Sequence, residues 1–149
     1  MISTREVTAA FIAMLATGTG KPVGEGTKPE GDHTEYYIVH TITRQTSGAP
    51  MTDLSEDCTI VYQVDHISAA DLTLPGSHGT QDQMEWLADT ARAVILARHP
   101  ITRTWLHPLT VPGARVIGRA ADTEVGGTAD ATDGIMSSAS RFAITLNSD

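Results

Sequence analysis

The chain has 149 residues, of which 40% are hydrophobic and 19% charged, and its net charge at neutral pH is −8. This composition is ordinary for a folded protein, and the length predicts that residues 1–149 form a single domain. The acidic balance excludes the basic footprint of a protein that reads nucleic-acid sequence. No apolar run approaches the roughly 20 residues that span a bilayer, so no membrane partner is expected. Cys58 is the only cysteine, which is typical of a protein assembled in a reducing cytoplasm.

The first predicted element is an amphipathic helix at Ser3–Thr17. Ser3 and Glu6 have the spacing of a capping box, in which each side chain bonds a free backbone N–H at the helix start. Gly18 is suited to end the helix in a left-handed conformation. The buried face is expected to consist of apolar residues at helical spacing, namely Val7, Ala10, Phe11, Met14 and Leu15.

A glycine-rich loop, Gly18–Asp32, follows with five glycines and two prolines. Loops of this length without structure of their own are functional or disordered. Gly20-Lys21 is a poor match to a phosphate-binding loop. Pro22 stands where a Ser or Thr would hold magnesium, and the loop follows a helix instead of a strand. No nucleotide cofactor is expected.

The remaining elements alternate between strands and one helix. Alternation of apolar and polar residues predicts strands, and a helical apolar stripe of Met84, Leu87, Ala88, Ala91, Val94 and Ile95 predicts the second helix. The predicted order α-β-β-α-β-β favours an α+β, two-layer fold with a four-stranded, mainly antiparallel sheet and both helices on one face. The predicted ranges are a strand at Tyr36–Ile42, a strand at Cys58–Asp65, a helix at Gly79–Arg98, a strand at Ala114–Glu124 and a strand at Arg141–Leu146.

The sequence shows no pattern typical of catalysis or metal binding. The six histidines are scattered and none forms a helical pair at i, i+4. There is no Gly-x-Ser-x-Gly nucleophile elbow, and Cys58 begins an alternating strand, which predicts a small core residue. We therefore expect no catalytic residue, no cofactor and no metal, and predict that the protein is not an enzyme.

Charge is segregated along the sequence. Between Arg44 and Arg92 there are acids but no Lys or Arg, whereas between Asp89 and Asp122 there are arginines but no acid. Two solvated surfaces would account for this pattern, and so would two complementary faces. Trp105 is either a core residue under the second helix or an interface anchor. The candidate interface residues are Asp82, Glu85, Asp89, Arg92, Arg98, Arg103, Trp105, Arg115 and Arg119.

The chain resembles the tail terminator, or tail-completion, proteins of long-tailed non-contractile phages, and among them the actinobacteriophage branch. The resemblance lies in the capped N-terminal helix, the loop Pro22-Val23-Gly24-Glu25-Gly26, the strand Tyr36–Ile42 and the order of the elements. It implies a hexameric ring at the neck of the virion, assembled in the host cytoplasm. Such a ring stops growth of the tail tube and docks the head-side connector, or stopper. It carries no catalytic residue.

A ring of identical subunits pairs one face of each copy with a different face of the next, which suits the segregated charge. The resemblance also implies that DNA passes through the ring without sequence-specific binding. Phosphates adhere to basic surfaces, so acidic loops are candidates for the channel wall. The candidates are Asp53, Glu56 and Asp57 in one loop, and Asp130 and Asp133 in another.

Two alternatives remain open from the sequence. One is another head–tail connector or minor tail protein of similar size. The other, from a different class, is a small-molecule-binding or enzymatic α+β domain that uses Gly18–Asp32 as a lid.

Overall fold

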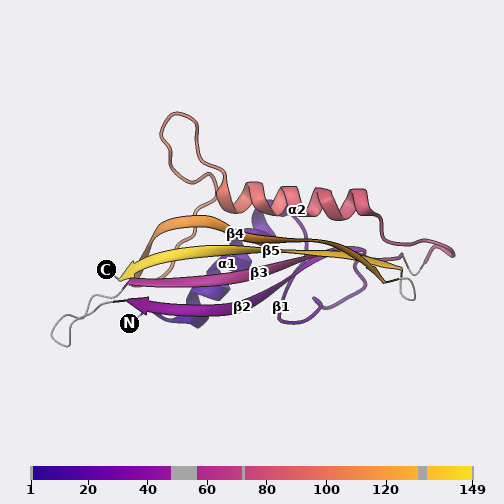
Figure 1. Cartoon of the computed structure of the whole chain (residues 1–149), viewed down its shortest axis with the longest axis horizontal. Helices are drawn as coiled ribbons and strands as arrows, with labels where there is room; N and C mark the ends of the chain where they lie inside the picture. Colours follow the sequence, from indigo (N-terminus) through magenta and orange to yellow (C-terminus); the bar gives the residue numbers. More distant parts are fainter. Residues whose placement is uncertain (1, 48–56, 72, 131–133, 149) are drawn as a thin grey trace.

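The computed structural model describes residues 2–47, 57–71, 73–130 and 134–148, and within them it shows two helices and five strands (Figure 1). One helix precedes the first β-hairpin in the sequence, and the other helix lies between the two hairpins. Each hairpin consists of two long strands. The elements are α1 (Thr4–Thr19), β1 (Val23–Glu25), β2 (Glu35–Ser47), β3 (Asp57–Ser68), α2 (Gln81–Leu96), β4 (Ala114–Asp130) and β5 (Ile135–Ser148).

The sheet is five-stranded and mixed, with the order β1-β2-β3-β5-β4. The β1–β2 pair is parallel, and the other three pairs are antiparallel. The prediction of a four-stranded, mainly antiparallel sheet was therefore wrong, although the fold is α+β. The missing strand was β1, which lies inside the glycine-rich loop.

β1 is a strand because it pairs with β2, and not because its own residues favour a strand. Tyr37 donates its backbone N–H to Pro22 O, and Gly26 donates to Val39 O. Three residues, one of them glycine, carry no alternation that could indicate a strand. The pairing also fixes the first half of the glycine-rich loop to the sheet edge, which leaves only its second half as irregular chain.

Both helices pack on the same face of the sheet. Phe11 of α1 stacks on Tyr62 of β3 with ring centroids 4.5 Å apart. Tyr37 of β2 donates its hydroxyl to Leu87 O of α2. Val39 pairs with Val64, so Tyr37 and Tyr62 point to the same side of the sheet. The apolar residues at alternate positions of the two predicted strands Cys58–Asp65 and Arg141–Leu146 are all buried there: Cys58, Ile60, Tyr62, Val64, Phe142, Ile144 and Leu146.

The helix ends differ from the predicted ones because tertiary contacts decide them. Ser3 caps α1 as predicted, since its Oγ accepts the N–H of Glu6. The helix continues past Gly18 and ends at Gly20, whose φ is 70°. Gly18 lies where α1 meets α2, and a Cβ there would come within 2.6 Å of a Val94 methyl. This glycine serves close helix packing instead of helix termination.

Two corrections concern α2 and β4. α2 begins after its N-cap Thr80 and ends at Leu96, two residues inside each predicted end. β4 continues to Asp130, beyond the predicted end at Glu124, because its ladder with β5 absorbs extra residues at register shifts, one of them between Val125 and Thr128.

The approach of α2 to the sheet depends on Gly79. A Cβ at this position would lie 1.9 Å from Ser68 O, while its own N–H bonds Gly134 O. We expect Gly79→Ala to lower the free energy of unfolding by about 2 kcal/mol or more, since backbone must move. At Gly118 a Cβ meets nothing closer than 3.7 Å, so Gly118→Ala is the matched control. Urea unfolding of both variants checks this, and equal stabilities would contradict the packing argument.

Candidate functional site

The face of α2 that is open to solvent carries all three acids of this helix. Asp82, Glu85, Trp86 and Asp89 recur at i, i+3, i+4 and i+7, so they share one side of the helix. Together with Lys21, Glu35 and Gln83 they line a shallow pocket of about 420 Å³. Trp86 is 47% exposed within it. We call this surface the Trp86 pocket.

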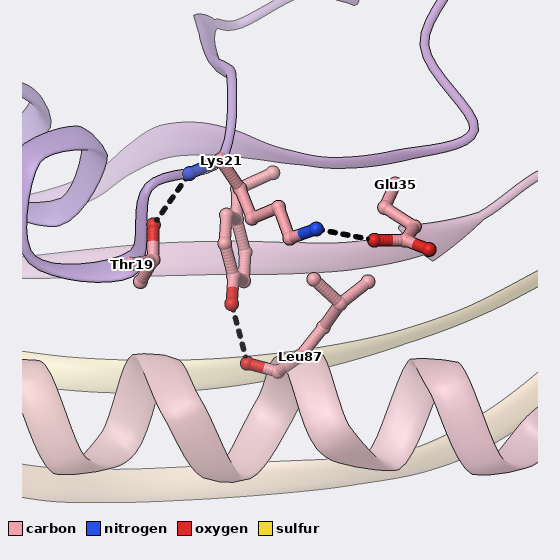
Figure 2. Close-up of polar contacts among 5 residues, drawn as sticks. Thr19, Lys21, Glu35 and Leu87 are labelled. Carbon is pink, nitrogen blue, oxygen red and sulfur yellow. Dashed lines mark hydrogen bonds and ion pairs between the residues drawn. The ribbon is translucent and has the colours of Figure 1, made fainter.

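Lys21 is the one cation of the Trp86 pocket, and the end of α1 fixes its backbone. Its N–H bonds Thr19 Oγ1, which in turn donates to Leu15 O. Its ammonium pairs with Glu35 at 2.5 Å and lies 5.4 Å from the centre of the Trp86 ring. Figure 2 shows Lys21 reaching from the end of α1 toward Glu35 on β2, above α2. Three carboxylates of the pocket, on α2, make no ion pair among the described residues: Asp82, Glu85 and Asp89.

A compact turn, Arg98–Trp105, follows α2 at its other end. Arg98 and Trp105 form an antiparallel bridge, and His99 N–H bonds Thr104 O. The segment after α2, salmon in Figure 1, rises away from the sheet at this end of the molecule. Ile101 in the turn is 83% exposed.

His99 holds this turn together from inside. Its carbonyl accepts the N–H of Arg103, and its Nδ1 accepts the N–H groups of Ile101 and Thr102. Arg103 has a φ of 62°, a left-handed conformation that non-glycine residues rarely adopt. A strained residue held by several hydrogen bonds indicates a turn whose shape is fixed before any partner arrives.

The base of the turn is an arginine–tryptophan cluster. The guanidinium of Arg98 lies 3.9 Å from the centre of the Trp105 ring, and that of Arg119 lies 4.7 Å from it. Arg119 is buried and donates to Ile95 O at the end of α2 and to Met14 Sδ. Burial, with a smaller effect of Arg98, lowers the pKa of Arg119 to about 10. It stays charged at neutral pH, stabilised by the carbonyl end of α2 and the ring.

The structure separates the nine predicted interface residues into groups. Asp82, Glu85 and Asp89 come together in the Trp86 pocket, and Arg98, Arg103 and Trp105 come together in the turn. Arg119 is buried beneath Trp105 at the base of that turn. The other two are elsewhere: Arg92 pairs with Glu124 of β4 in the same chain, and Arg115 is exposed at the start of β4.

The two described residues among the predicted channel candidates, Asp57 and Asp130, lie at opposite ends of the sheet. Asp57 begins β3 beside Asn147, near the end of β5, and accepts a hydrogen bond from its Nδ2. Asp130 ends β4 opposite Ile135, at the other end of β5. The other candidates, Asp53, Glu56 and Asp133, lie outside the described residues.

A second pocket of about 350 Å³ lies beside the glycine-rich loop. The loop contributes Lys28 and Asp32, His33 follows it, and Tyr36 of β2 completes one wall. This is the place that a lid at Gly18–Asp32 would cover. In the part of the chain that the structure describes, no three His, Cys, Asp or Glu side chains gather as metal ligands. Neither described helix has the length and apolar character to cross a membrane.

Sequence reasoning missed Trp86, Ile101, Lys21 and Glu35. For Trp86 a signal existed, because it falls outside the apolar stripe of its helix and among acids. Ile101 follows Pro100, which marks a turn and therefore exposure. Lys21 and Glu35 reach the pocket only through the β1–β2 pairing, which no local pattern indicated.

Comparisons with known proteins bear on the fold. No protein-family model matches the sequence, and no curated protein matches it. Among solved structures, the chain is similar to one described as "Virion of native gene transfer agent (GTA) particle". The TM-score is 0.58 at 11% sequence identity, and the match covers 98% of this chain and 95% of that chain. At this identity the match shows a shared fold.

Proposed function

We propose that this chain is a structural protein of a virion. The observation that carries the proposal is the fold match, which extends over nearly the whole length of both chains and pairs this chain with one from a gene transfer agent particle. The resemblance of the N-terminal helix, loop and first long strand to tail terminator proteins supports the same class.

Within that class we propose a hexameric ring that caps the tail tube, stops its polymerisation and docks the head-side connector. A ring needs two different surfaces on each copy. The Trp86 pocket and the Arg98–Trp105 turn are two such surfaces, opposite in charge and at opposite ends of α2. In the described part of the chain, the α2 carboxylates of the pocket and the arginines of the turn form no ion pair.

The proposed channel is supported by the positions of Asp57 and Asp130, the two candidates that the structure describes. Asp57 and Asp130 lie at opposite ends of the sheet. A channel lined by both loops therefore requires strands that run along its axis, with DNA passing between acidic rims. A ring in which either loop lies on the outer circumference would contradict this arrangement.

The proposal is tested by mass from light scattering together with negative-stain imaging of the purified protein. We expect rings with a central hole and a mass six times that of the chain. A monomer that is stabilised by a small ligand, bound in the second pocket between Lys28 and Tyr36, would contradict the proposal and favour the ligand-binding class.

A further inference from the structure

We propose that the Arg98–Trp105 turn of one copy docks in the Trp86 pocket of a second copy of this chain. The inference rests on the proposed function, since it names the contact that would build the ring. The occupant is a second copy because the two surfaces match in charge and in exposed apolar groups, as follows.

The two surfaces cannot meet within one molecule. Glu85 lies near the start of α2 and Arg98 lies just beyond its end, so about 13 residues of helix, or roughly 20 Å, separate them. Among the described residues, neither the three α2 carboxylates of the pocket nor the two arginines of the turn form an ion pair within their own chain. An identical neighbour supplies both partners at once.

The charges are complementary. The pocket presents four carboxylates and one ammonium, and that ammonium already pairs with Glu35. The turn presents the exposed guanidinium groups of Arg98 and Arg103, and the described residues give neither an ion pair. Arginine pairs with carboxylates through two parallel hydrogen bonds, which fixes orientation as well as attraction.

Each surface also exposes a large apolar group. Ile101 is 83% exposed in the turn, and Trp86 is 47% exposed in the pocket. Contact between them would remove both from water, and tryptophan surrounded by polar groups is a common centre of interface energy. Because the hydrogen bonds of His99 already fix the turn, docking loses little conformational entropy.

The test exchanges charge between the two surfaces. Glu85→Arg places a cation in the pocket, and Arg103→Glu places an anion in the turn. Each variant alone faces itself with like charges, so we expect association at least roughly tenfold weaker than wild type at low salt. Mixed in equal amounts, the two variants present an arginine to a carboxylate at every contact, and assembly is expected to return.

Three further variants separate docking from folding. Arg103→Gly removes the charge and also relieves the left-handed strain, so we expect weaker association with unchanged or higher stability. Arg5→Glu and Glu30→Arg reverse exposed charges that line neither surface, and they are expected to associate like wild type. Association is measured by sedimentation velocity over a concentration series, and unfolding by urea.

Each outcome decides one proposal. Loss in both single variants with recovery on mixing supports the contact. Normal assembly of either single variant, or failure of the mixture to recover, overturns it, and in those cases rings of wild-type protein would leave the proposed function standing. Recovery as closed dimers without rings supports the contact and contradicts the ring. A wild-type chain that stays monomeric at its highest soluble concentration, or a pocket that binds only a different protein, overturns the contact between copies.

Discussion

Lowering the pH from 7 to 4.5 is expected to destabilise this protein by about 2 to 3 kcal/mol through His66 alone. His66 lies on β3 with its side chain fully buried, and its Nδ1 bonds Ser138 Oγ at 2.8 Å. Its Nε2 has no hydrogen-bond partner within the described residues. Burial lowers the pKa of His66 to about 4, against weaker opposing effects of Asp65 and Glu124.

The sign follows from proton counts. The unfolded chain binds a proton at His66 near pH 6.5, whereas the folded chain binds it only near pH 4. Between these values the unfolded state holds more protons, so the free energy of unfolding falls as the pH falls.

The measurement compares wild type with His66→Gln by urea unfolding at pH 7 and pH 4.5. Carboxylates titrate in both proteins, so their contribution cancels when the variant's loss of unfolding free energy between the two pH values is subtracted from that of wild type. We expect the variant to lose about 2 to 3 kcal/mol less than wild type over this range. Equal losses in both proteins would show that His66 does not stay neutral when folded.

Replacing Tyr62 by alanine is expected to lower the free energy of unfolding by about 3 to 5 kcal/mol, the largest effect of any single substitution considered. Tyr62 is fully buried at the centre of β3. Its ring stacks on Phe11 at an angle of 12°, which joins α1 to the sheet. Its hydroxyl bonds Thr8 Oγ1 at 2.9 Å, and burial raises the pKa of Tyr62 to about 12.

Tyr62→Phe is the matched control, because it keeps the stack and removes only the hydroxyl. We expect it to cost about 1 kcal/mol. Urea denaturation reports both values when the m-value, the dependence of the unfolding free energy on urea concentration, is the same for the two variants and wild type. Similar losses in the two variants would mean that the hydrogen bond to Thr8, and not ring packing, holds α1 on the sheet.

The long elements were predictable because each carries a complete local pattern. The capping box at Ser3 and the apolar stripe of α2 were enough to place both helices to within about two residues. Alternation in β3 and β5 identified their inward residues, including Cys58. These patterns indicate which side of a helix or strand faces the core, and the residues on that side are the buried ones.

The features that could not be predicted from the sequence depend on contacts between segments that are distant along the chain. β1 forms through hydrogen bonds to β2. Gly18 remains within α1, where a side chain would collide with Val94 of α2. The candidate surfaces show the same limit. Segregated charge along the sequence indicated acidic and basic surfaces, but only the fold shows Arg119 buried under Trp105 and Arg92 paired with Glu124.

Electron cryomicroscopy of particles that contain this chain tests the central claim most directly. We predict copies arranged in a closed ring around an open channel, between the last ring of the tail tube and the head-side connector. The turn that carries Ile101 would lie against Trp86 of the adjacent copy. A chain found as isolated monomers, absent from the particle or enclosing a bound small substrate, would contradict it.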